Sequence, residues 1–129
     1  MTSPAALCPA PSEPTLWVPV CRLSEMPPER GVAALVHGEQ VALVRTHDEQ
    51  VFAVQQGDPY SAAMVMSRGL VGSRRQRPTI ASPMFKQVFD LATGECLDPV
   101  GKEPIALRTW PIRVENGVVS IGLSDRAET

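Results

Sequence analysis

The sequence predicts an all-β fold, a sandwich or partly open barrel of short antiparallel strands with two long loops. Three observations support this prediction. Short β-branched runs recur along the chain between polar turns. Asn116-Gly117 lies between two alternating apolar runs, which is the strongest short signal for a hairpin. Almost no stretch has the apolar period of a helix. Strands this short and frequent are typical of sandwiches and barrels.

The length of 129 residues fits one domain. Residues 1–14 are rich in Pro, Ala and Ser, and we expect them to be a flexible tail, with a second short tail over residues 124–129. The folded domain is therefore expected over residues 15–123.

The first half of this domain is expected to be a meander of hairpins. The segment 22–31 contains Pro27-Pro28 and is expected to be a loop, because proline cannot donate to a strand ladder. The expected strands are 15–20, 32–36, 41–45 and 51–54.

Two long connections follow. The first covers residues 55–69, and its small and Met residues over 61–67 predict one or two helical turns. Loops longer than about 12 residues are uncommon in compact domains and are often functional, so this one is a candidate site. The second is centred on residues 82–85. The remaining chain is expected to contain a short strand at 70–71, a basic loop at 72–78, and strands at 79–81, 87–90, 95–97, 107–114 and 118–123.

Composition and charge exclude several functions. The net charge is −2, which argues against nucleic-acid binding. No apolar run approaches the length of a membrane span, and the N-terminal stretch lacks the features of a signal peptide. Cys8, Cys21 and Cys96 form no C-x-x-C pair and cannot build a disulfide scaffold. A cytoplasmic protein with no membrane or nucleic-acid partner is the expectation.

The sequence offers no catalytic or metal site. His37 and His47 flank one hairpin, and Glu39 or Asp48 could complete a ligand set with them. Both histidines are expected in solvent-facing turns, so we assign no metal. Ser82 has no histidine nearby, so no nucleophile–base pair can be argued.

The element order and four short strings resemble a Rieske-type ferredoxin domain over about residues 15–123. In that family the first loop carries C-x-H and the second carries C-x-x-H, and these four side chains hold a [2Fe–2S] cluster. The strings are Phe52-Ala53-Val54, Asp58-Pro59-Tyr60, Ser82-Pro83-Met84-Phe85 and Phe89-Asp90-Leu91-Ala92-Thr93-Gly94.

The resemblance places the four ligand positions at Asp58, Tyr60, Ser82 and Phe85, and Lys86 replaces the following glycine. A carboxylate, a phenol, a hydroxyl and a benzyl group do not replace thiolates and imidazoles as a set. We therefore expect a Rieske-like fold with a degenerate site, no cofactor and no metal.

Each of these residues has an expected structural role. Phe85 is expected to fill the core where a cluster would lie. Asp58 is expected to cap the turn after Pro59, with contact to a partner as the alternative. Tyr60 and Ser82 are expected to form a hydrogen-bonded pair between the loops.

As a ligand-free Rieske domain, this sequence is similar to the small subunits of cytoplasmic NAD(P)H-dependent nitrite reductases. The similarity lies in Gln87-Val88-Phe89-Asp90-Leu91-x-Thr-Gly and in the insertion Ser67-Arg68-Gly69-Leu70-Val71-Gly72. It implies a large partner subunit that carries FAD, an iron–sulfur cluster and sirohaem and reduces nitrite to ammonium in nitrate assimilation. The alternative is a Rieske-fold binding or regulatory module of another oxidoreductase, such as a ring-hydroxylating system.

Basic residues gather in the two loops and between them. No acid occurs from Pro59 to Phe89, so no acid near in sequence can neutralise these cations. They form either an ordinary solvated face or a docking surface for an acidic partner. In cluster-bearing relatives these loops face the electron partner, so we expect docking here. The residues are Arg68, Arg74, Arg75, Arg77 and Lys86.

Overall fold

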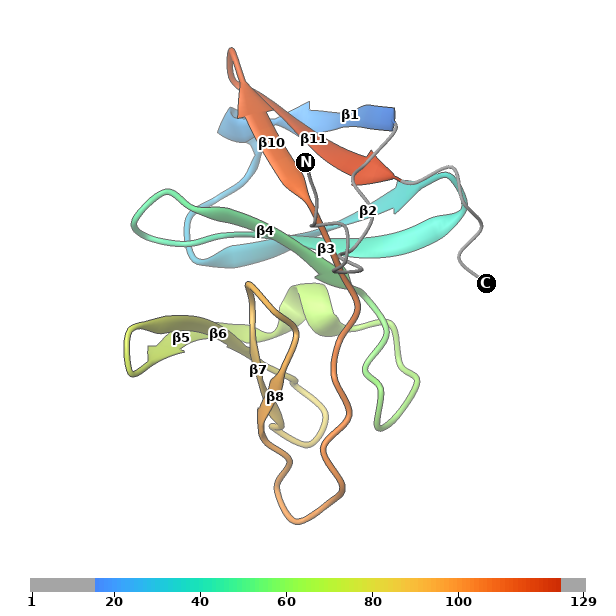
Figure 1. The fold of residues 1–129 in the computed structure, drawn as a ribbon, viewed down its shortest axis with the longest axis vertical. Helices are drawn as coiled ribbons and strands as arrows, with labels where there is room; N and C mark the ends of the chain where they lie inside the picture. The colour runs from blue at the N-terminus through green and yellow to red at the C-terminus, as the bar shows by residue number, and fades with distance from the viewer. Residues whose placement is uncertain (1–15, 124–129) are drawn as a thin grey trace, which may run out of the picture.

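The computed structural model describes residues 16–123, so both expected tails, 1–14 and 124–129, lie outside the described residues. The described chain folds into three antiparallel sheets that follow one another from top to bottom in Figure 1. This sandwich-like arrangement confirms the all-β prediction. Within residues 16–123, no helix is long and apolar enough to cross a membrane.

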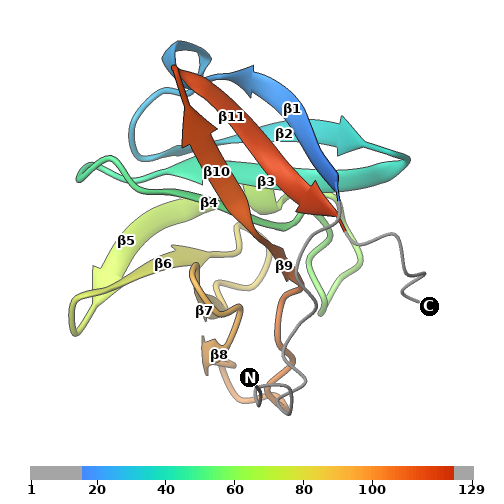
Figure 2. The ribbon, with the colours of Figure 1, turned by 45° about the horizontal axis from the view of Figure 1, so that its top comes forward.

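The upper sheet brings together the two ends of the described chain (Figure 2). The hairpin between its last two strands turns at Asn116 and Gly117, whose φ angles are 52° and 78°. Two consecutive positive φ angles are what a type I′ turn requires, so the predicted Asn-Gly hairpin is confirmed. The strand order is β1 (Leu16–Arg22), β11 (Val118–Leu123) and β10 (Ile112–Glu115).

The middle sheet contains the predicted meander. The single strand expected over 107–114 is wrong, because Pro111 has no N–H to donate and the ladder breaks there. The short strand before Pro111 pairs in the middle sheet, and the strand after it pairs in the upper sheet. The strand order is β2 (Arg30–Val36), β3 (Glu39–Arg45), β4 (Val51–Gln55) and β9 (Thr109–Trp110).

The lower sheet corrects a second prediction. The basic segment 72–78 is a β-hairpin rather than a loop, in which Arg74 pairs with Arg77. Its two turn residues, Arg75 and Gln76, have φ angles of 52° and 71°. Neither is a usual turn residue, so the sequence carried no signal for this hairpin. The strand order is β5 (Leu70–Arg74), β6 (Arg77–Ala81), β7 (Val88–Asp90) and β8 (Cys96–Asp98).

Helical structure within residues 16–123 is confined to two short 3-10 turns, η2 (Leu23–Glu25) and η3 (Met66–Arg68). The helical turns expected over 61–67 are therefore reduced to η3. The segment expected as a loop over 22–31 contains η2, and β2 begins within it at Arg30.

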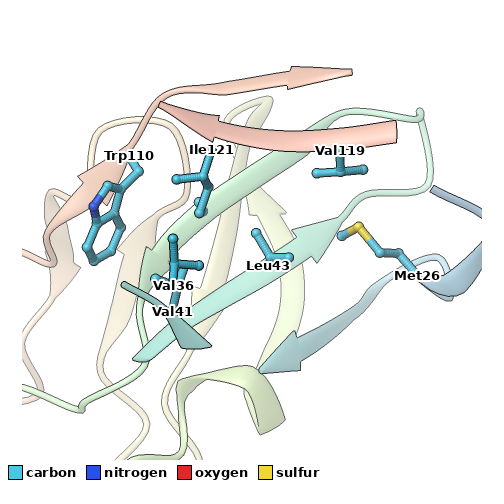
Figure 3. Close-up of a cluster of buried hydrophobic side chains, with 8 residues drawn as sticks. Met26, Val36, Val41, Leu43, Trp110, Val119 and Ile121 are labelled. Atoms are coloured by element: carbon cyan, nitrogen blue, oxygen red, sulfur yellow. The ribbon is translucent and has the colours of Figure 1, made fainter. Parts of the chain in front are cut away.

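The middle sheet is buried on both faces, which explains the continuous apolar run of β3. Val41 and Leu43 belong to the upper cluster, whereas Ala42 and Val44 belong to a lower one. Side chains alternate across a strand, so one run of four serves both layers. The upper cluster, most of which is labelled in Figure 3, is Met26, Val36, Val41, Leu43, Ala53, Trp110, Val119 and Ile121. The lower cluster is Ala42, Val44, Val54, Met66, Ile80, Phe89, Leu91 and Leu107.

The F-D-x-x-T-G string forms a tight turn between β7 and β8. Oδ1 of Asp90 accepts hydrogen bonds from the N–H groups of Ala92 and Thr93, at 2.7 and 3.0 Å. Gly94 has a φ of 83°, and its carbonyl accepts the N–H of Leu107 at 2.8 Å. A Cβ on Gly94 would collide with the carbonyl oxygen of Leu107. This position therefore needs glycine for its backbone angle and for its close contact.

Replacing Gly94 with alanine should lower the free energy of unfolding by about 2 kcal/mol or more, because the left-handed angle alone costs about 1–2 kcal/mol and a backbone clash is added. Gly101 is the matched control, since its φ is 81° but nothing lies within 4 Å of an added Cβ. Gly101→Ala should lower the free energy of unfolding only by the cost of the left-handed backbone angle. Urea unfolding of both variants measures the difference, and equal losses would contradict the role of the Leu107 contact.

Candidate functional site

A buried carboxylate joins the two long loops. Asp58 is 1% exposed, and its Oδ2 accepts a hydrogen bond from the Ser82 hydroxyl at 2.5 Å. Its Oδ1 accepts the N–H of Tyr60 at 2.8 Å. The second bond is the turn-capping role expected for Asp58, which is confirmed. The bond to Ser82 was not foreseen, and it connects residues that are 24 positions apart in the sequence.

The expected Tyr60–Ser82 pair is wrong. The hydroxyl of Tyr60 donates to the carbonyl of Glu103 at 2.6 Å and accepts the N–H of Ile105 at 2.8 Å. Ser82 instead donates to Oδ2 of Asp58, which the closing of the two loops brings within hydrogen-bond distance. Tyr60 thus joins the first loop to a third loop, 99–106, that sequence analysis did not single out.

The Tyr60 hydroxyl is also 3.6 Å from the sulfur of Cys96. Burial, followed by the contact with Cys96, raises the pKa of Tyr60 above its ordinary value. The phenol therefore stays protonated at neutral pH and keeps its role as a donor to Glu103.

Phe85 does not fill the core, so that expectation is also wrong. Its side chain is 50% exposed. Two backbone hydrogen bonds close this loop at its base, from Ser82 N to Gln87 O at 2.9 Å and from Lys86 N to Ser82 O at 3.0 Å. Residues 83–86 consequently form a tip outside the core, and all four are exposed.

The four aligned positions do not fit a [2Fe–2S] cluster. Asp58 and Ser82 offer hard oxygen atoms that are bonded to each other, Tyr60 is bonded to the third loop, and Phe85 has no donor atom. A Rieske cluster requires two thiolates and two imidazoles. Over residues 16–123, no group of three or more His, Cys, Asp or Glu side chains could hold a metal ion.

A second buried polar residue lies at the base of the second loop. Gln87 is 0% exposed, and within the described chain neither its Oε1 nor its Nε2 has a hydrogen-bond partner. Gln56 is also buried, but its Oε1 accepts the N–H of Ser67 at 2.7 Å and its Nε2 donates to the Ser67 hydroxyl at 2.9 Å. A buried polar group without a partner costs about 1–3 kcal/mol, so we expect Gln87 to lower the stability of the base of this loop.

The basic residues are not a uniform free surface. Arg77 donates to Asp90 at 2.6 Å and to Glu95 at 2.9 Å, and Arg74 lies 3.8 Å from Asp98. No acid close in sequence neutralises these two arginines, as expected, but the fold supplies each of them with an acid that is distant in the sequence. Their partners come from β7, β8 and the turn between them, which sheet pairing brings alongside the β5–β6 hairpin.

Three of the five cations expected to form the docking surface have no ion pair within the described residues, and they are separated. Arg68 lies in η3, Arg75 in the β5–β6 turn, and Lys86 at the tip of the second loop, with a φ of 67°. A surface cavity of about 660 Å³ lies beside the hairpin, and the acidic partners of Arg74 and Arg77 offset much of its positive charge. Its lining residues are Ser73, Arg74, Arg75, Arg77 and Leu97.

The pKa of Asp90 reflects two opposed effects. Burial disfavours its charged form and raises the pKa, but hydrogen bonds from the Thr93 N–H, Arg77 and the Ala92 N–H, together with the charge of Arg77, lower it by more. The net result is a pKa below the ordinary value of 3.8. Asp90 therefore remains ionised in the folded chain, held between the turn and β6.

The three layers and the paired loops make this chain a Rieske-like domain whose ligand positions are occupied by other residues. The family model described as a Rieske-like [2Fe-2S] domain matches residues 16–122. The chain belongs to this family and, within it, to the family of nitrite reductase small subunits, as the following relatives show.

The small subunit of nitrite reductase (NADH) from Escherichia coli K12 is 38% identical over 106 residues, which are 81% of this chain and 95% of that protein. The solution structure of a nitrite reductase [NAD(P)H] small subunit from Erwinia carotovora has a TM-score of 0.69 at 37% identity, covering 86% of this chain and 84% of that one.

A third relative is a large subunit. The nitrite reductase [NAD(P)H] large subunit of Klebsiella oxytoca is 41% identical over 112 residues, which are 87% of this chain but only 11% of that protein. In that relative, the counterpart of this domain is therefore one part of a much longer polypeptide.

Replacing Arg77 with alanine should reduce stability at neutral pH, because Asp90 would stay buried without its cation. A lowered folded-state pKa contributes stability above the ordinary pKa of 3.8, and that contribution is lost as pH falls through the folded-state value. The difference in stability between the wild type and Arg77→Ala should therefore become smaller below about pH 4. Thermal unfolding from pH 3 to pH 7 measures this, with Arg75→Ala as the control. A difference in stability that does not change with pH would contradict a stabilising Arg77–Asp90 ion pair.

Replacing Gln87 with methionine, which has a similar shape, should raise the free energy of unfolding by about 1–3 kcal/mol, because it removes an unpaired buried amide. Gln56→Met is the matched control and should have the opposite sign, since it leaves the Ser67 N–H without its acceptor. Denaturant unfolding compares the two variants. Destabilisation by Gln87→Met would show that the amide does have a partner, such as a buried water.

Proposed function

We propose that this chain is the small, non-catalytic subunit of an NAD(P)H-dependent nitrite reductase, which converts nitrite to ammonium in nitrate assimilation, and that it binds the large subunit. The Klebsiella oxytoca relative carries this proposal. There, 87% of this chain has a counterpart inside a nitrite reductase large subunit. A domain that is fused to the large subunit in one relative and separate in others is expected to occupy the same place in both arrangements.

The site geometry supports a role without chemistry of its own. The side chains at the four ligand positions bind each other, the third loop or solvent, rather than converging on a shared point. They provide no soft donor set for electron transfer and no nucleophile–base pair. We therefore assign FAD, the iron–sulfur cluster and sirohaem to the large subunit, and no cofactor to this chain.

We place the complex in the cytoplasm. Cys21 and Cys96 are both free thiols, which fits a reducing compartment. A regulatory module of a ring-hydroxylating or other oxidoreductase is the less supported alternative. The relatives from Escherichia coli and Klebsiella oxytoca, which are 38% and 41% identical over most of this chain, carry nitrite reductase names.

The purified chain should contain no iron and no acid-labile sulfide after anaerobic reconstitution, because the donors at Asp58, Tyr60, Ser82 and Phe85 do not suit iron. Iron and sulfide analysis and the visible spectrum measure this, with a Rieske ferredoxin reconstituted in parallel as the positive control. Stoichiometric iron with the absorption of a [2Fe–2S] centre would contradict the assignment.

The function itself is tested by coexpressing the tagged chain with the large nitrite reductase subunit from the same source. The two should co-purify, and the complex should reduce nitrite with NADH or NADPH. The isolated chain should show no turnover with reduced viologen or with either nucleotide. Turnover by the isolated chain would refute its non-catalytic role, and failure to form a complex would refute the proposed partnership.

A further inference from the structure

Three loops meet at one end of the molecule. The Asp58–Ser82 hydrogen bond joins the first loop to the second, and the two hydrogen bonds of Tyr60 join the first loop to the third. In Figure 1 these loops lie below the middle sheet, on the side away from the upper sheet. The three loops therefore form one surface rather than three independent tips.

This surface exposes large apolar side chains. Met84 and Phe85 on the second loop are 43% and 50% exposed, and Val100 and Ile105 on the third are 48% and 42% exposed. We call these four residues the apical patch. Single exposed apolar residues are ordinary, but several on adjoining loops are typical of an interaction site. Phe and Met are also among the residue types enriched at protein interfaces.

Two residues in or beside the patch have unfavourable backbone angles. Val100 has a φ of 53°, in the left-handed region that a β-branched residue rarely adopts, and Lys86 beside Phe85 has a φ of 67°. Such conformations persist where the surrounding structure imposes them, and they are found disproportionately at functional sites.

We propose that the apical patch is the docking face for the large nitrite reductase subunit, an inference that rests on the proposed function. The relative from Klebsiella oxytoca supports this choice of partner, because there the counterpart domain and the rest of the large subunit belong to one chain. The β5–β6 hairpin is the weaker candidate, since Arg74 and Arg77 already have acidic partners within this chain.

Charge around the patch defines the chemistry of the partner face. Lys86 and Lys102 lie on the exposed parts of the second and third loops, and neither has an ion pair among residues 16–123. Two acids lie beside them: Glu103, which is exposed, and Asp98, which accepts the N–H of Val100 at 3.0 Å and is 3.8 Å from Arg74. The partner face should therefore have an apolar centre with carboxylates opposite the two lysines. In a contact between two copies of this chain, the lysines of one copy would face the lysines of the other, and like charges repel. We therefore assign the patch to the large subunit.

The test uses the full-length chain and the purified large subunit, with the dissociation constant measured by calorimetry. Phe85→Glu and Val100→Glu should each weaken binding about tenfold or more, because each places a charge in the apolar centre. Leu35→Glu is the matched control. Leu35 is 71% exposed on β2 of the middle sheet and belongs to none of the three loops, so its variant should bind like the wild type. Circular dichroism confirms that each variant is folded.

The outcomes separate this inference from the proposed function. If both patch variants bind the large subunit as tightly as the wild-type chain does, the assignment of the patch as the docking face is overturned while the proposed function stands. If the wild-type chain does not bind, the function fails and the patch assignment fails with it. Greater weakening by Arg68→Glu or Arg75→Glu than by Phe85→Glu would move the docking face to the basic residues. A wild-type dimer in sedimentation that Phe85→Glu abolishes would reassign the patch to a second copy.

Discussion

The buried carboxylate of Asp58 is the constraint on which the loop end of this molecule depends. In a cluster-binding Rieske domain, the metal centre ties the two long loops together. Here a hydrogen bond from Ser82 and a capped turn at Tyr60 make that connection instead. Because Tyr60 also binds the third loop, the position of all three loops follows from one carboxylate and one phenol.

The sheets beneath the loops form a rigid base because the middle sheet has an apolar cluster on each face. The chain crosses between sheets at Pro111, where the ladder cannot continue. The lower sheet is held by Arg77, which connects β6 to Asp90 and Glu95. The contact of Gly94 with Leu107 then fixes the point from which the chain returns to the middle sheet.

This arrangement separates charge from apolar surface in a way that suits a binding subunit. Arg74 and Arg77 find their partners within the lower sheet, so much of the basic character visible in the sequence is used internally. Phe85, which the sequence analysis places in the core, is exposed at a loop tip instead, together with Met84, Val100 and Ile105. The degenerate ligand site and the apical patch are thus two consequences of the same loop geometry: the polar residues turn inward and the apolar ones outward.

The sequence by itself determined the local features: the alternating strands, the Asn116-Gly117 turn, the F-D-x-x-T-G turn and the donor atoms available at the ligand positions. Each depends on residues that are neighbours in the chain. Only the tertiary structure decided that Ser82 binds Asp58 rather than Tyr60, that Arg77 meets Asp90 and Glu95, and that Phe85 is exposed. These contacts join residues 13 to 24 positions apart or depend on how a loop closes. Strand register and loop closure set which long side chains meet, and local residue preferences do not encode them.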